Sequence, residues 1–347
     1  MNAENTAKIT IIVPCYNEEK NIKLLYQRIM TTFAHNPYNC DFELIFIDDG
    51  SSDQSEKIIN EHAKKDARVK GIFLSRNFGQ QAAITAGINH ASGDAVVFMD
   101  ADLQDPPELI LKMIEQWVNG YDVVYARRNK RIKESFFKKM TAAVFYRLLS
   151  KLTSINIPID TGEFRLVSKD VLEALKSMPE KTRFIRGMIT WIGFKQTSVY
   201  FDREERKIGE TKYSLSKMYR LACDGITAFS VAPLKISTYL GLSISFISFV
   251  VILYSIYQKL NHNTKLISGW TSIIVTILFM GGIQLISLGI IGEYLSRVFE
   301  EVKNRPVYVV RKTTTGSNSI YENAHAHAHT QTQAQANEKN FMLSSQT

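Results

Sequence analysis

Cysteine is scarce in this 347-residue sequence, and the three cysteines that occur are not paired by spacing. Cys15, Cys40 and Cys223 are scattered and odd in number, which is typical of a protein in a reducing compartment. We also expect no secretory signal, because the first apolar run, Ile9–Val13, is too short and begins a strand. The polar part of the chain is therefore expected in the cytoplasm.

A basic element interleaved with aromatic residues is also missing, although the chain is basic overall. Lysine and arginine together number 42, against 34 acidic residues, which gives a formal net charge of +8. Nucleic acid is therefore not an expected partner, and anionic lipid headgroups fit the basic charge better.

Charged residues are absent from the middle of two long apolar runs. The runs, Leu234–Tyr257 and Trp270–Tyr294, each have roughly the 20 residues needed to span a bilayer. Gly281-Gly282 lies inside the second run, as is common in membrane helices. A buried hairpin in a soluble core is the alternative, and the missing charges argue against it. We predict a two-span transmembrane hairpin within residues 232–298.

Basic residues flank this hairpin more densely than they occupy its connecting loop, which holds Lys259 and Lys265. By the positive-inside rule, both termini lie in the cytoplasm and the loop lies outside. This predicts a multi-pass protein of the inner (cytoplasmic) membrane, with residues 1–231 as its cytoplasmic domain. The flanking basic residues are Lys212, Lys217, Arg220 and Lys235 before the first run and Arg297, Lys303, Arg305, Arg311 and Lys312 after the second.

Two amphipathic stretches and two polar segments surround the hairpin. Phe136–Leu152 has one apolar face and a basic remainder, which favours a helix lying on the membrane, with a helix packed on the domain as the alternative. Tyr213–Ser230 is a second amphipathic stretch that leads into the first span. Residues 299–312 are predicted to be a cytoplasmic basic segment, and residues 313–347 a disordered tail.

Short apolar runs alternate with amphipathic stretches in the first part of the chain. This alternation predicts an α/β fold with a doubly wound, mostly parallel sheet and helices on both faces. Ligands of such sheets bind beyond the carboxyl ends of the strands. The predicted strands are Ile9–Val13, Glu43–Ile47, Val69–Leu74, Ala95–Met99 and Asp122–Ala126, and the predicted helices are Glu19–Ala34, Ser55–Lys65, Gly79–His90 and Pro107–Asn119.

The first two strands are each followed by a motif suited to a nucleotide. After the first, Pro14 stiffens the turn and Tyr16 offers a ring to a nucleobase. Glu18 can accept hydrogen bonds from a base or ribose, or it can serve only the helix dipole, with Asn17 as the helix cap. The second strand ends in Ile47-Asp48-Asp49-Gly50-Ser51-Ser52-Asp53, an acidic pair before a turn. Its acids can receive N–H or O–H donors, while Asp53 can cap the next helix.

A third acidic motif, Asp100-Ala101-Asp102-Leu103-Gln104, closes the fourth predicted strand. Mg²⁺ and Mn²⁺ take oxygen ligands, and Mg²⁺ is typically held by one or two carboxylates together with substrate phosphates. We expect Asp102 to bind the metal directly and Asp100 to reach ribose or metal through water. Gln104 is expected to orient a phosphate.

These three segments together resemble the inverting glycosyltransferases of family 2, which have the GT-A fold. The later segments Asp160–Arg165 and Arg206–Tyr213, with the two-run hairpin, resemble the polyisoprenyl-phosphate glycosyltransferases. That subgroup contains the bactoprenol glucosyltransferases and, less similar, the dolichyl-phosphate mannose synthases. The resemblance covers roughly residues 8–312.

The resemblance implies a role for each motif. Arg206 and Lys212 match a basic pair that closes over phosphates. The planar guanidinium of the arginine and the ammonium of the lysine can together neutralise phosphate oxygens. Asp160 and Glu163 are implied site residues, either of which can act as base, position the acceptor, organise Arg165 or tune the metal charge. The implied catalytic residues are Asp102, Asp160, Glu163, Arg206 and Lys212; those for the nucleotide sugar are Pro14, Tyr16, Glu18, Ile47, Asp49, Asp100, Ala101, Gln104 and Arg127; and those for Mg²⁺ or Mn²⁺ are Asp102 and Asp100.

The predicted function is the inverting transfer of a hexose to a polyprenyl phosphate, with glucose from UDP-glucose and undecaprenyl phosphate as the first choice. Mannose from GDP-mannose, or another nucleotide sugar, is an alternative donor. A non-catalytic membrane scaffold that binds nucleotides is a second alternative. A processive polysaccharide synthase is disfavoured because its Gln-x-x-Arg-Trp motif is missing. The resemblance also implies a homo-oligomer, a tetramer.

Overall fold

The computed structural model describes residues 6–128, 161–201, 232–260 and 270–314. The chain forms two units, one made of residues 1–134, 157–212 and 305–347, and one made of residues 135–156 and 213–304. Several predictions lie outside the described residues: the amphipathic stretches Phe136–Leu152 and Tyr213–Ser230, the site residues Asp160, Arg206 and Lys212, and the tail beyond Thr314.

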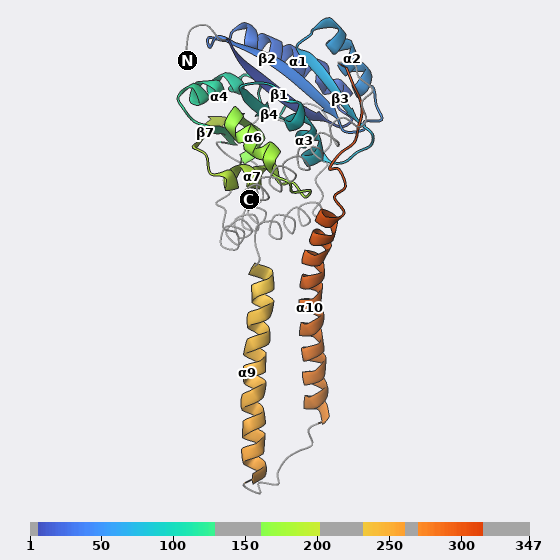
Figure 1. The fold of residues 1–347 in the computed structure, drawn as a ribbon, viewed down its shortest axis with the longest axis vertical. Helices are drawn as coiled ribbons and strands as arrows, with labels where there is room; N and C mark the ends of the chain where they lie inside the picture. The colour runs from blue at the N-terminus through green and yellow to red at the C-terminus, as the bar shows by residue number, and fades with distance from the viewer. Residues whose placement is uncertain (1–5, 129–160, 202–231, 261–269, 315–347) are drawn as a thin grey trace, which may run out of the picture. The chain divides into compact units, whose positions relative to one another are not determined.

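One eight-stranded sheet forms the centre of the first unit, with the strand order β7-β5-β6-β4-β1-β2-β3-β8 (Figure 1). Strands β3, β2, β1 and β4 run parallel, as predicted. Strand β6 is antiparallel to β4 and β5, and β8 is antiparallel to β3, so the whole sheet is mixed. The strands are β1 (Ala7–Cys15), β2 (Cys40–Asp48), β3 (Val69–Leu74), β4 (Ala95–Phe98), β5 (Val123–Arg128), β6 (Thr161–Ser168), β7 (Gln196–Phe201) and β8 (Val310–Thr313).

Helices cover both faces of this sheet, because neighbouring residues of its apolar strands are buried on opposite sides. Ile11 of β1 belongs to a core cluster that includes residues of α1, α2 and α4. Ile12 lies under α3 instead, where a Cβ at Gly87 would meet its Cγ2 at 2.4 Å. The helices are α1 (Glu19–Ala34), α2 (Ser55–Lys65), α3 (Gln80–His90), α4 (Leu109–Val118), α6 (Lys169–Ser177) and α7 (Ile185–Ile192).

The five predicted strands and four predicted helices of the first part are confirmed, with two local differences. Asn17 does not cap α1: it has a positive φ of 54° and precedes the N-cap residue, Glu18. Helix α4 begins at Leu109, so Pro107 lies before the helix rather than in its first turn.

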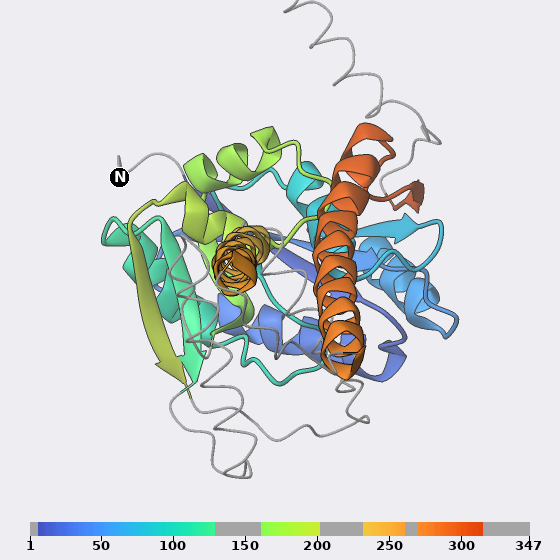
Figure 2. The ribbon, with the colours of Figure 1, turned by 90° about the horizontal axis from the view of Figure 1, so that it is seen from below.

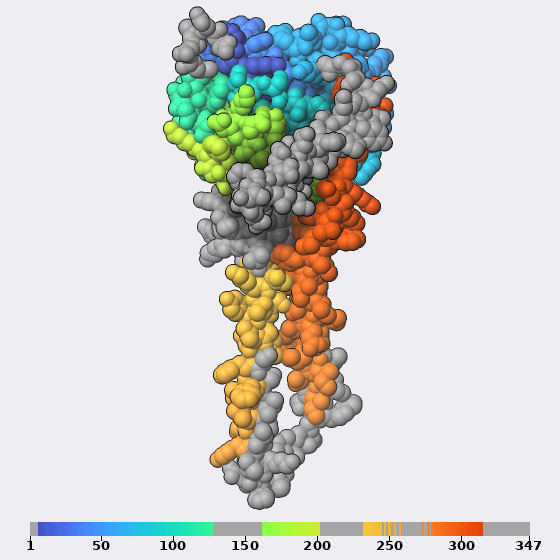
Figure 3. Space-filling view, in the orientation of Figure 1, coloured from blue at the N-terminus to red at the C-terminus, as the bar shows by residue number. Residues whose placement is uncertain are grey.

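Two long helices, α9 (Ala232–Leu260) and α10 (Trp270–Val302), form the described core of the second unit and run antiparallel (Figure 1). The Oγ atoms of Ser237 and Ser287 are 2.6 Å apart, which joins the two helices by a hydrogen bond. Side chains of both helices stand at the surface of this hairpin (Figure 3). Among the described residues, Phe279–Val302 is long and apolar enough to cross a membrane.

The chain after α10 differs from the prediction of a basic segment followed by a tail. Residues 299–302 continue α10, and residues 310–313 form β8, which pairs with β3 at the edge of the sheet (Figure 2). Arg311 and Lys312 pair with Glu56 of α2. Two of the charges used to predict the membrane orientation therefore lie beside a carboxylate of the first unit.

Candidate active site

The three acidic motifs follow β1, β2 and β4, which are adjacent parallel strands, so the motifs meet at one edge of the sheet. The first two are tied together by main-chain and side-chain hydrogen bonds. The N–H of Asp49 donates to the carbonyl of Cys15 at 2.9 Å, and the N–H of Ser52 donates to Oδ1 of Asn17 at 2.8 Å. The left-handed backbone of Asn17 thus serves this loop contact rather than a helix cap.

Asp53 joins the starts of α1 and α2. Its Oδ2 accepts the N–H of Glu19 at 3.1 Å, and its Oδ1 accepts the N–H of Ser55 at 3.0 Å. Burial alone would raise the pKa of Asp53, but these hydrogen bonds hold it below its ordinary value. The prediction that Asp53 caps α2 is wrong, because Gln54 is the N-cap residue; Asp53 lies one residue earlier and joins the starts of both helices.

Asp49 is buried, and the loop before α3 supplies its hydrogen bonds. Oδ1 accepts the N–H of Phe78 at 2.7 Å, and Oδ2 accepts the N–H of Gly79 at 2.9 Å. Burial raises the pKa of Asp49, and the two N–H groups offset part of that rise. Each oxygen keeps a second lone pair, so Asp49 can hold this loop and still accept from a ligand.

The other residues predicted to bind the nucleotide sugar differ in exposure and in the groups that a ligand can reach. Tyr16 is exposed, Pro14 is half-buried, and Glu18 accepts a hydrogen bond from Nδ2 of Asn21 at 2.6 Å. The side chain of Ile47 is fully buried, so only its main chain is available to a ligand. Arg127 is exposed near the end of β5, with Nη1 at 3.4 Å from the hydroxyl of Tyr200.

The third motif gathers negative charge at the end of β4. Oδ1 of Asp100 accepts from Nε2 of Gln80 at 2.7 Å, and Oδ1 of Asp102 accepts the N–H of Gln104 at 3.2 Å. Burial, followed by the charges of Asp105, Asp102 and Glu163, raises the pKa of Asp100 to about 8. These acids therefore repel one another, which is the electrostatic condition that a bound cation relieves.

The motif has two further features that shape the site. Leu103 has a φ of 60°, a left-handed conformation that is uncommon for a side chain of its size and that clusters at ligand-binding and active sites. Ala101 is buried, so a larger side chain there would disturb the turn between the two aspartates.

A divalent metal fits these carboxylates only if the substrate and water supply its remaining ligands. Among the residues that the structure describes, no three His, Cys, Asp or Glu side chains are arranged to hold a metal ion. Mg²⁺ commonly uses only one or two carboxylates and takes its other ligands from water and substrate phosphates. Asp102 and Asp100 match that requirement, so the metal would bind together with a diphosphate.

Strand β6 brings Glu163 to the same edge, because it runs antiparallel to β4 and begins where β4 ends. Oε1 of Glu163 is 3.0 Å from Nη2 of Arg186. Burial alone would raise the pKa of Glu163, but the charges of Arg186 and Arg165 hold it below its ordinary value. Burial lowers the pKa of Arg165 to about 10, and its Nη2 donates to the carbonyl of Gly162 at 2.8 Å.

Known protein families match both parts of the chain. Residues 10–176 match the glycosyl transferase family 2 domain, and residues 232–298 match the GtrB C-terminal hairpin. The uncharacterized glycosyltransferase YkcC of Bacillus subtilis (strain 168) is 51% identical over 317 residues, which cover 91% of this chain and 97% of the relative. The chain belongs to glycosyltransferase family 2.

Two further comparisons involve proteins with named activities. The SfII prophage-derived bactoprenol glucosyl transferase of Shigella flexneri is 41% identical to this family 2 glycosyltransferase over 310 residues, which cover 89% of the chain and 99% of the relative. The crystal structure of glucosyl-3-phosphoglycerate synthase from Mycobacterium tuberculosis gives a TM-score of 0.43 at 18% identity, covering 64% of this chain and 78% of that one.

Three residues of the glycosyltransferase site were not predicted. Gln80 and Gln81 begin α3, which follows β3, so the rule that placed the acids at strand ends would have found them as well. Arg186 carries no such signal, since its contact with Glu163 depends on how α7 packs in the folded protein.

Proposed function

We propose that this glycosyltransferase moves a hexose from a nucleotide sugar to a polyprenyl phosphate with inversion, and that the preferred pair is UDP-glucose and undecaprenyl phosphate. The observation that carries the proposal is one chain with two parts. Its family 2 sheet gathers Asp100, Asp102 and Glu163 at one edge, and it continues into a hairpin of the GtrB type. The name of the 41% identical relative, a bactoprenol glucosyl transferase, supports the choice of sugar and lipid.

The nucleotide sugar binds along the edge formed by the ends of β1, β2, β4 and β5. The exposed ring of Tyr16 is available to stack on the base, and Asp49 and Glu18 can accept its N–H or the ribose O–H groups. Gln104 and Arg127 are suited to the diphosphate and sugar. The full set is Pro14, Tyr16, Glu18, Ile47, Asp49, Asp100, Ala101, Gln104 and Arg127.

Asp102, with Asp100 beside it, would hold Mg²⁺ or Mn²⁺, and the metal would supply positive charge for the departing nucleoside diphosphate. Arg206 and Lys212, which lie outside the described residues, add positive charge to the same leaving group. A phosphate monoester near neutral pH has largely lost its protons, because its second pKa is about 6. The acceptor oxygen can therefore attack the anomeric carbon in one displacement, with little help from a base.

Glu163 and Asp160 serve the acceptor in this scheme. The arginines beside Glu163 keep its carboxyl ionised, which favours an orienting role over proton transfer. The exposed apolar surface of the hairpin supports residence in the inner membrane, with two spans, cytoplasmic termini and the lipid acceptor in the same bilayer. We further propose that the enzyme is a homo-tetramer.

A transfer assay tests the proposal. The purified full-length enzyme is incubated in lipid with undecaprenyl phosphate, Mg²⁺ or Mn²⁺, and a panel of radiolabelled nucleotide sugars. We expect label from UDP-glucose in the lipid fraction. Label only from GDP-mannose or another donor would move the assignment to that sugar, and donor binding without any transfer would indicate a non-catalytic scaffold.

A further inference from the structure

Glu163 is held by a side chain that belongs to none of the sequence motifs. Arg186, in the first turn of α7, donates from Nη2 to Oε1 of Glu163 at 3.0 Å. The two side chains are 18% and 11% exposed, so water competes little for this contact. A charge-assisted hydrogen bond in such surroundings fixes the direction of a carboxylate more firmly than one at the surface does.

Helix α3 supplies a second contact to the same carboxylate. The side chain of Gln81 hydrogen-bonds to Glu163, and its Oε1 accepts the N–H of Ile185 at 3.0 Å. Gln80, its neighbour, binds Asp100. The first turn of α3 therefore touches both acids that β4 and β6 bring to the site, and it also holds the start of α7.

The charges around Glu163 come from three elements. Arg186 of α7 and Arg165 of β6 are positive, and Asp100 of β4 is an acid. The contacts with Arg186 and Gln81 fix the direction of the Glu163 carboxylate. Without Arg186, only Arg165 and Gln81 of these neighbours would remain to orient the Glu163 carboxylate.

We propose that Arg186 is a positioning residue of the transfer reaction, holding the Glu163 carboxylate in the direction that the acceptor phosphate requires. This inference rests on the proposed function. Arg186 acts through Glu163. Gln81 of α3 also hydrogen-bonds to Glu163 and so helps to hold the same carboxylate. A role limited to bracing α7 is the competing explanation, and it predicts a loss of stability instead of a loss of turnover.

The chain contains a matched control for that competing explanation. Arg183, three residues before Arg186, donates to the main-chain carbonyls of Leu175 and Glu180 at 3.2 Å each. These contacts brace the segment that leads into α7. Arg183→Met is therefore expected to lower the melting temperature while leaving the turnover of the folded enzyme unchanged.

The test compares Arg186→Met and Arg186→Lys with the wild type in the full-length enzyme. We expect Arg186→Met to lower kcat by about 10- to 100-fold with little change in the KM for the nucleotide sugar, which is the loss typical of an outer-shell partner. Arg186→Lys keeps one charge and one donor, and it should recover part of that loss. Equal kcat in Arg186→Met and wild type would overturn the proposal.

A double-mutant cycle with Glu163→Ala shows whether Arg186 acts through Glu163. Once Glu163 is gone, Arg186→Met should reduce kcat no further. If the second substitution lowers kcat by the same factor as in the wild type, the two residues act separately and the proposal fails.

The same four proteins also separate this inference from the proposed function. If the wild type transfers no sugar to lipid, the proposed function fails. A thermal-unfolding cycle then still judges the pair, because contacting residues give non-additive changes in stability. If the two substitutions have additive effects on both kcat and the melting temperature, Arg186 does not hold Glu163.

Discussion

At the scale of single residues, Asp102 carries the metal assignment. Its carboxylate is half-buried and accepts the N–H of Gln104, so Asp102→Asn keeps an acceptor for that contact. We expect this variant to fold normally and to lose more than about 100-fold in activity. Residues that only hold a metal ligand in place typically cost about 10- to 100-fold when they are changed. The measurement is sugar transfer with a titration of Mg²⁺ or Mn²⁺, and the melting temperature is the control. Wild-type activity at ordinary Mg²⁺ would refute the assignment.

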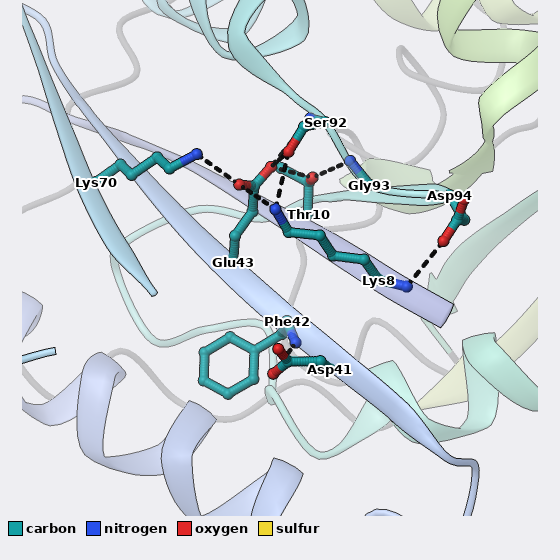
Figure 4. Close-up of polar contacts among 9 residues, drawn as sticks. All are labelled: Lys8, Thr10, Asp41, Phe42, Glu43, Lys70, Ser92, Gly93 and Asp94. Carbon is teal, nitrogen blue, oxygen red and sulfur yellow. Dashed lines mark hydrogen bonds and ion pairs between the residues drawn. The ribbon is translucent and has the colours of Figure 1, made fainter. Parts of the chain in front are cut away.

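Glu43 shows what a buried acid does far from the site (Figure 4). Its side chain is 2% exposed and accepts from Lys8 and Lys70 at 2.9 and 2.8 Å, and from Thr10 at 2.7 Å. Burial alone would raise the pKa of Glu43, but these donors lower it to about 2. This carboxylate therefore stabilises the sheet, whereas burial and neighbouring acids raise the pKa of Asp100.

The pH dependence of stability follows from this lowered pKa. An acid whose pKa is lower in the folded protein stabilises it fully above the ordinary value of 4.5, and the effect is lost as the pH falls toward about 2. We expect Glu43→Gln to reduce the free energy of unfolding by about 2–3 kcal/mol at pH 7, because the two lysines lose their partner. Unfolding measured at pH 7 and pH 3 should show this difference shrink in acid. A difference that is independent of pH would contradict the role of the charge.

Asp49, Asp100 and Asp102 could be predicted from sequence, since they follow apolar strands whose ends share one edge. Glu163 lies inside β6 and was indicated only by the family resemblance. Arg186 could not be predicted, because its contact with Glu163 depends on how α7 packs in the folded protein. The prediction also missed that Asp49 holds the loop at Phe78 and Gly79, a contact between a side chain and a distant main chain.

At the scale of elements, the predictable strands are those with continuous apolar runs. Strand β6 was missed because Glu163 and Arg165 interrupt its apolar pattern, although Arg165 is buried. Strand β7 is only half-buried for most of its length. Strand β8 is four residues long and contains Arg311 and Lys312, so its sequence indicates an exposed basic segment.

Strand β8 is expected to support the first unit. Besides its ladder with β3, the segment donates the N–H of Thr314 to the carbonyl of Gly71 at 2.9 Å, and the hydroxyl of Tyr308 accepts from Asn89 at 2.8 Å. The N–H of Ser75 donates to the carbonyl of Val309 at 2.9 Å, next to the loop that binds Asp49. The segment therefore contacts β3, α3 and the loop between them.

Two truncations test this support. A chain ending at Thr314 retains the whole segment and should match the wild type in melting temperature and transfer. A chain ending at Asn304 exposes the edge of β3, and we expect a lower melting temperature and weaker nucleotide-sugar binding because the loop before α3 loses its neighbour. Isothermal titration with UDP-glucose measures the second effect. Identical behaviour of the two truncations would show that β8 contributes little.

At the scale of the whole molecule, hydropathy alone predicted the two long helices, because an apolar run of this length is a signal that needs no tertiary contacts. The structure adds that α10 extends beyond the predicted run to Val302. It also adds that residues 310–314 pair with β3 of the first unit, which hydropathy cannot indicate.

The hairpin predicts how the molecule behaves toward membranes. We expect the full-length protein to remain in the membrane fraction after a wash with alkaline carbonate, because the apolar side chains of α9 and α10 would otherwise face water. Fractionation followed by immunoblotting measures this, with a peripheral membrane protein as the control. If the wash releases the protein, the hairpin binds to the membrane surface and does not span the bilayer.

The position of β8 also sets the order in which a newly made chain can mature. Its partner β3 leaves the ribosome early, while residues 310–313 emerge only after both helices of the hairpin have been synthesised. Until then one side of the nascent sheet lacks its hydrogen-bonding neighbour, and such an edge readily joins other chains. The sheet of this enzyme is therefore completed only after the whole hairpin has been made.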